Sequence, residues 1–102
     1  MYYIVGDIGN TSTRICLVNK RSKIIKSFLI ETKKIFIKPY VKNIFKNLFK
    51  KNVKKEILFS CVVPLAFKKI KYYFKDSNYK FFEIKKFNLK KIIKINIKNI
   101  SQ

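Results

Sequence analysis

The fold is decided by the opening stretch of the chain, YYIVGDIGNT, which covers residues 2–11. Tyr2 to Ile8 is rich in β-branched and aromatic residues, which predicts a strand, and Gly9-Asn10 predicts the turn that ends it. Residues 13–18 (TRICLV) continue in the same character, so the two runs predict a β-hairpin. Residues 24–30 predict a third strand after a polar break. The three strands together indicate an antiparallel meander.

The period of the apolar residues changes after Pro39. They then recur at the spacing of one helical face, at Val41, Ile44, Phe45, Leu48 and Phe49. Residues 57–63 form a continuous apolar run, as expected for a strand that is buried on both sides. Pro64 suits the first turn of a second helix, with an apolar stripe at Phe67, Ile70 and Phe74. Residues 79–84 predict a fifth strand.

The predicted order is therefore strand-strand-strand-helix-strand-helix-strand, an α/β fold built on a mixed five-stranded sheet. Right-handed crossovers would place the first and fourth strands side by side in the centre of that sheet. Residues 1–84 are expected to form one lobe. Residues 85–102 alternate lysine and isoleucine and contain no clear turn signal that would mark the end of an element.

Composition excludes several classes of function. The chain has 102 residues, enough for one small domain, and its 48% hydrophobic content is too high for a disordered basic tail. The absence of histidine excludes Ser-His-Asp and Cys-His catalysis within this chain. Two cysteines, Cys16 and Cys61, can build neither a four-cysteine zinc site nor a disulfide framework. Both lie in apolar stretches, so we expect core packing in a reducing cytoplasm.

The formal charge of +20 permits nonspecific binding to polyanions, but 23 of the 25 basic residues are lysine. Specific contacts to bases and phosphates favour arginine, and lysine, isoleucine and asparagine are enriched together, as A- and T-rich codons would produce. Two alternatives to an enzyme follow from the charge. One is a small basic nucleic-acid-binding module with stacking Phe and Tyr residues. The other is a membrane-surface element, because residues 39–55 form a basic amphipathic helix, although the same stripe suits core packing.

No membrane span is predicted, because the longest uncharged stretch, residues 57–67, is far shorter than the roughly 20 residues that a bilayer requires. The start of the chain also has no basic region before its apolar run, so it does not resemble a signal peptide.

The segment that carries chemistry is Asp7-Ile8-Gly9-Asn10-Thr11. Asp7 is one of five acidic residues, and a carboxylate in so apolar a stretch costs stability unless something binds it. Gly9 lets backbone N–H groups approach an anion, and Asn10 and Thr11 add an amide and a hydroxyl. Asp7 can hold Mg²⁺ through water. The segment predicts a phosphate site. The alternative is a plain hairpin turn in which Asp7 accepts turn hydrogen bonds.

This segment resembles the first phosphate motif of the actin-like ATPase superfamily, and its Asn-Thr variant is similar to type III pantothenate kinases in particular. In that family a third strand ends near a threonine, which is similar to residues 28–32 (FLIET) here. A later strand ends in a Ser-x-Val-Val-Pro element, which is similar to residues 60–64 (SCVVP). The resemblance covers residues 1 to about 84.

The resemblance implies a ribonuclease H-like fold and ATP-dependent phosphorylation of pantothenate, the first step of coenzyme A synthesis. It implies that Asp7 holds the metal and its phosphate-bound water, while Gly9, Asn10 and Thr11 hold the ATP phosphates. Ser60 would lie where the fourth strand meets the cleft, or would simply end the strand or cap the next helix. The family resemblance also implies a monovalent cation, potassium or ammonium, and a homodimer.

Members of the family carry a second lobe, which begins near a Gly-x-Asp-Arg element whose aspartate is the expected base for the pantothenate hydroxyl. No acid of this chain falls at that position, so the expected base lies beyond Gln102 and residues 85–102 are expected to lead toward the second lobe. We therefore expect the N-terminal half of a kinase, with no catalytic residue of its own and inactive alone.

Overall fold

The structure is a computed structural model that describes residues 1–84. Within them the chain forms one five-stranded sheet with the strand order β3-β2-β1-β4-β5. The strands are β1 (Tyr2–Ile8), β2 (Ser12–Asn19), β3 (Ile24–Glu31), β4 (Glu56–Cys61) and β5 (Lys80–Ile84). The helices are η1 (Thr32–Phe36), a short 3₁₀ helix, α1 (Lys38–Leu48) and α2 (Pro64–Tyr73).

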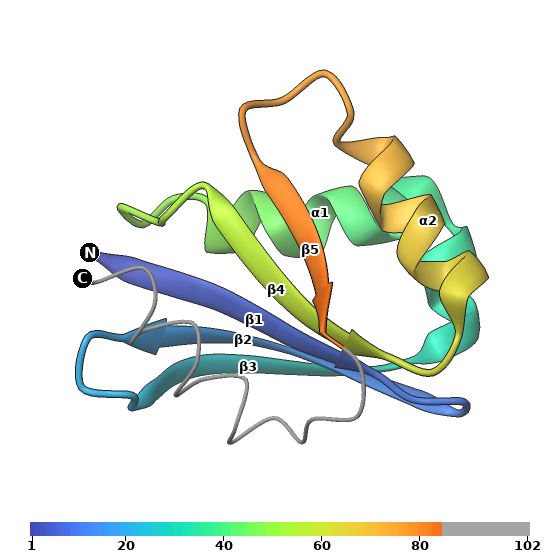
Figure 1. The fold of residues 1–102 in the computed structure, drawn as a ribbon, viewed down its shortest axis with the longest axis horizontal. Coiled ribbons are helices and arrows are strands. Elements are labelled where there is room, and N and C mark those ends of the chain that lie inside the picture. Colours follow the sequence, from blue (N-terminus) through green and yellow to red (C-terminus); the bar gives the residue numbers. More distant parts are fainter. Residues whose placement is uncertain (85–102) are drawn as a thin grey trace.

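The predicted element order and topology are confirmed. Strands β1, β2 and β3 form the antiparallel meander, whereas β4 pairs parallel with β1 and β5 pairs parallel with β4. Strand β1 therefore lies in the centre of the sheet (Figure 1). The prediction for residues 85–102 lies outside the described residues.

Two local features differ from the prediction. The fourth strand ends at Cys61 rather than at residue 63, because the chain enters α2 at Pro64. The Val62 N–H still donates to the Ile8 carbonyl of β1 at 3.0 Å. Helix η1 was not predicted, since its five residues are too few for a periodic signal. Its Ile35 is nevertheless fully buried, so η1 belongs to the core.

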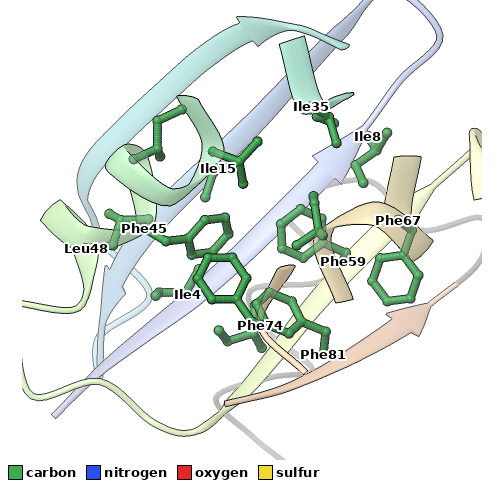
Figure 2. Packing of buried hydrophobic residues seen from close by; sticks show 14 of the residues in the cluster. Ile4, Ile8, Ile15, Ile35, Phe45, Leu48, Phe59, Phe67, Phe74 and Phe81 are labelled. Atoms are coloured by element: carbon green, nitrogen blue, oxygen red, sulfur yellow. The ribbon is translucent and has the colours of Figure 1, made fainter. Parts of the chain in front are cut away.

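Both α-helices pack on the same face of the sheet. The apolar stripe of α1 is buried there, together with that of α2 and inward residues of every strand (Figure 2). Phe45 of α1 packs edge-on against Phe74 at 5.0 Å and Phe81 at 5.7 Å between ring centroids. Core packing thus occupies the stripe that would serve a membrane-surface helix. It also occupies the rings of Phe45, Phe67 and Phe74, whereas Tyr72 and Phe82 are exposed. No helix within residues 1–84 is long and apolar enough to cross a membrane.

Gly6 is the residue of β1 that lets the strand pack against its parallel neighbour. It lies opposite Phe59 in the register, and a Cβ atom at Gly6 would come within 2.3 Å of the Phe59 ring. Phe59 is itself fully buried and contacts Phe67 and Phe81, so its ring has no free space to move into. The close approach therefore requires glycine at this position.

We expect Gly6→Ala to lower the free energy of unfolding by about 1–3 kcal/mol, because it overpacks a closed site. Urea unfolding of the variant measures this change. Phe59→Leu should also destabilise on its own, but the double variant should lose less than the sum of the two losses, because the smaller side chain makes room for the methyl group. An unchanged midpoint in Gly6→Ala, or strict additivity, would contradict this packing.

Both cysteines are free and buried, as predicted. Cys16 lies on β2, where burial raises the pKa of its thiol and a hydrogen bond to the Ser27 hydroxyl offsets part of that rise. Burial likewise raises the pKa of the Cys61 thiol at the end of β4, and the negative charges of Glu83 and Asp7 raise it further. Both thiols consequently stay protonated at a pH where an exposed thiol begins to ionise.

At pH 8 we expect iodoacetamide to modify the native thiols at least about tenfold more slowly than the urea-unfolded thiols, because the thiolate is the nucleophile. The rate should increase as the pH rises, since the raised pKa delays ionisation. Mass spectrometry of the alkylated peptides measures each site, and a Cys61→Ala variant isolates Cys16. Equal rates in the native and unfolded chains would show that the thiols are accessible.

Candidate functional site

The Gly9 turn (Gly9–Thr11) joins β1 to β2 at the carboxyl end of β1. The Gly9 N–H donates to the Ser12 carbonyl at 2.9 Å, which closes the hairpin. Gly9 does not have a positive φ. A Cβ atom at Gly9 would instead lie 2.9 Å from the Ser12 carbonyl oxygen, so the position needs glycine because the backbone approaches closely. Asn10 and Thr11 are exposed, and their side chains are open to a ligand.

The pairing of the strands places Asp7 between two polar side chains on the face of the sheet opposite the helices. Its register partner on β2 is Arg14, and its partner on parallel β4 is Ser60. Side chains at such directly opposed positions lie on one face, about 4.5–5.5 Å apart at Cβ in antiparallel pairs. We call these residues and their partners on the edge strands the Asp7 row, which consists of Leu29, Arg14, Asp7, Ser60 and Ile84.

The structure thus brings together every site residue that the sequence predicted. Asp7 and Ser60 are register partners, and the Gly9 turn follows Asp7 by one residue. The side chain of Ser60 is buried and that of Asp7 is half-buried. Their proximity depends on the parallel pairing of β1 with β4, which the right-handed crossover predicted.

This location is a topological switch point of the sheet. After β1 the chain turns toward β2, whereas after β4 it turns the other way, into α2 and then β5. Adjacent strands whose connections diverge leave a crevice outside their carboxyl ends, and ligands of open α/β sheets bind there. Figure 1 shows the β1–β2 turn and the start of α2 at this same end of the sheet.

The Asp7 carboxylate has no basic partner among the described residues. Within residues 1–84 it takes part in no ion pair, and Arg14, its neighbour on β2, donates instead to the Ser27 hydroxyl at 3.4 Å. The same residues contain no cluster of three acidic or cysteine side chains that could hold a metal ion. A divalent ion here would therefore take one carboxylate, water and oxygens of the ligand, which is how proteins commonly hold Mg²⁺.

Sequence reasoning did not assign three further residues to this site. Arg14 is one of two arginines in the chain, and counting back across the hairpin from the Gly9 turn would have placed it opposite Asp7. Thr13 and Thr32 are buried beneath the turn and bond to one another at 2.9 Å between their Oγ1 atoms. Thr32 also donates from Oγ1 to the Gly9 carbonyl at 2.7 Å. The threonine at the end of the third strand was noted, but nothing in its sequence context showed this contact.

A hollow in the surface lies elsewhere. It has a volume of about 550 Å³ and lies between α2 and the start of β5. Four lysines and several aromatic rings line it, and none of the predicted site residues does. Because Lys80 at the start of β5 pairs with Glu56, whereas Asp7 pairs with Ser60, this hollow is at the opposite end of the sheet from the Gly9 turn.

A solved structure shares this fold. A putative sugar kinase from Cytophaga hutchinsonii superposes with a TM-score of 0.57 at 14% sequence identity, over 83% of this chain and 36% of that protein. The PPX-GPPA enzyme of Aquifex aeolicus covers the same share of this chain at 18% identity, with a TM-score of 0.49. The likeness to the sugar kinase agrees with the predicted ribonuclease H-like fold of the actin-like ATPase class.

Sequence comparison identifies the family. The type III pantothenate kinase of Pelagibacter ubique (strain HTCC1062) is 47% identical over 95 residues, which is 92% of this chain. The chain spans 38% of the length of that relative. The sequence model of one family, type III pantothenate kinase, matches residues 3–102. This match covers nearly the whole chain, so the chain belongs to the type III pantothenate kinase family.

Proposed function

We propose that this chain is the phosphate-binding lobe of an ATP-dependent pantothenate kinase, the enzyme of the first step of coenzyme A synthesis. The observation that carries the proposal is the position of Asp7 beside Ser60 and one residue before the Gly9 turn, at the switch point of the sheet. The 47% identical relative bears the name of this enzyme, and the similarity extends over almost all of the chain.

Each site residue has a role in this proposal. The Gly9 turn presents backbone N–H groups, the Asn10 amide and the Thr11 hydroxyl to the phosphates of ATP, because Asn10 and Thr11 are exposed. Asp7 holds Mg²⁺ through water. Bound Mg²⁺ would neutralise charge on the phosphates during transfer. Ser60 borders the phosphates from β4. A monovalent cation, potassium or ammonium, would complete the site.

The remaining parts of the active site belong to a second lobe in this proposal, with residues 85–102 leading toward it. That lobe would supply the adenosine pocket and the aspartate that accepts the proton of the pantothenate hydroxyl. Exposed apolar side chains at the carboxyl end of the sheet support a covering partner there, since Leu29 is 62% and Val62 61% exposed. The single lobe would be inactive alone, and the complete protein would form a homodimer in the cytoplasm.

We expect Asp7→Asn to reduce ATP-dependent phosphorylation of pantothenate by the complete enzyme by at least about 100-fold, because the substitution removes the charge that holds the metal. A coupled assay that detects ADP measures the rate. Asp76→Asn is the matched control, because Asp76 is an exposed aspartate beyond the end of α2 and should leave the rate unchanged. Full activity of Asp7→Asn would refute the assignment of Asp7, and no turnover of pantothenate by the unmodified complete enzyme would refute the function.

A further inference from the structure

A chain of buried hydroxyl groups connects the Gly9 turn to the end of β3. Thr32 donates twice to this turn, from its Oγ1 to the Gly9 carbonyl at 2.7 Å and from its backbone N–H to the Thr11 carbonyl at 2.9 Å. Its side chain is 3% exposed, and that of its partner Thr13 is fully buried. One residue at the start of η1 therefore holds the carbonyls of the first and last residues of the turn.

The direction of the protons in this chain follows from the acceptors. A carbonyl oxygen can only accept, so the single hydroxyl proton of Thr32 is committed to Gly9. The bond between the two threonines must then be donated by Thr13 to the Thr32 oxygen. The order is Thr13 to Thr32 to Gly9, and a hydroxyl that accepts one hydrogen bond donates the next more strongly.

The Gly9 carbonyl determines where the next N–H group points. The carbonyl of Gly9 and the N–H of Asn10 belong to one planar trans peptide, so they point in opposite directions. Thr13 pairs with Ile8 of the core and lies on the face that the helices cover, which places Thr32 and the Gly9 carbonyl on that side. The N–H of Asn10 consequently points toward the other face, on which Asp7 lies. Within residues 1–84 this N–H makes no hydrogen bond.

We propose that Thr32, ordered by Thr13, is a positioning residue that directs the Asn10 N–H toward the phosphate of the bound nucleotide. Glycine tolerates both orientations of the peptide that follows it, so the backbone alone does not fix this orientation. If the peptide between Gly9 and Asn10 were reversed, the Gly9 carbonyl oxygen would face the anion and repel it. The inference rests on the proposed phosphate-binding function of the turn, to which it adds a residue of η1.

The test measures binding of Mg²⁺·ADP to the complete protein by isothermal titration calorimetry. Thr32→Val keeps the β-branched shape and removes the hydroxyl, so it should raise the Kd about five- to tenfold. Thr32→Ser retains the hydroxyl and should stay within about twofold of the unmodified protein. The ¹⁵N-labelled protein gives a second measurement, because the ADP-induced shift of the Asn10 amide resonance should be lost in the Val variant and kept in the Ser variant.

Tyr73→Phe is the matched control for the loss of a hydrogen bond that stabilises the fold. The Tyr73 hydroxyl donates to the Ile35 carbonyl of η1 at 2.8 Å, the same kind of contact in the element that Thr32 begins. This variant should lower the thermal midpoint as Thr32→Val does and leave the Kd unchanged. If Thr32→Val does not fold, Thr13→Val replaces it, with an expected two- to threefold rise in Kd, about half the free-energy effect.

Three results would overturn the positioning role of Thr32. An unchanged Kd in a folded Thr32→Val variant, or in the Thr13→Val replacement, would overturn the positioning role and leave the proposed function standing. An equal loss in Thr32→Ser or in Tyr73→Phe would also overturn it, because the hydroxyl would not be responsible. No binding of Mg²⁺·ADP by the unmodified complete protein would overturn the positioning role together with the proposed function.

Discussion

Everything in this lobe depends on the two-sided pairing of β1. The strand is paired antiparallel with β2 along one edge and parallel with β4 along the other, and it is covered by the helices on one face. A strand so enclosed can carry a charged group only near the end where the chain leaves the sheet, because burial of an unpaired carboxylate is costly. Asp7 occupies that end. The parallel partner then brings Ser60 beside Asp7, although a hairpin, a third strand and a helix separate the two residues along the chain.

Much of this arrangement could be predicted from the sequence, because it follows from periodicity and crossover handedness. The β-branched and aromatic residues of β1, the helical spacing from Val41 to Phe49 and the proline at the start of α2 each predict one element from local sequence alone. The contact of Thr32 with the Gly9 turn could not be predicted, because it depends on the exact register of β3 and on how the chain leaves that strand. The early end of β4 was missed for a related reason, since the apolar character of Val62 and Val63 does not show where the chain leaves the strand and turns into α2.

The surface lysines contact aromatic rings more often than they form ion pairs with acidic side chains. Within residues 1–84 a single ion pair occurs, between Lys33 and Glu31 at 3.4 Å on an exposed part of the surface. Lysine ammonium groups lie instead over ring faces, for example Lys55 over Tyr79 at 4.2 Å and Lys42 over Phe74 at 4.4 Å. Such contacts stabilise by about 0.5–1 kcal/mol at exposed sites, and they need no carboxylate. A chain with five acids can therefore carry 25 basic residues without losing the packing beneath them.

The parallel pairing of β1 with β4 also has a consequence for the order of folding. The meander of β1, β2 and β3 consists of sequence-local pairings, which close at little entropic cost and form early. The second edge of β1 stays unpaired until the ribosome has released β4, so the central strand is completed on both sides only after the whole meander and α1 have been made. During synthesis the exposed edge of β1 is the part of the nascent chain most open to pairing with another strand. The site around Asp7 comes into existence only when that edge is closed.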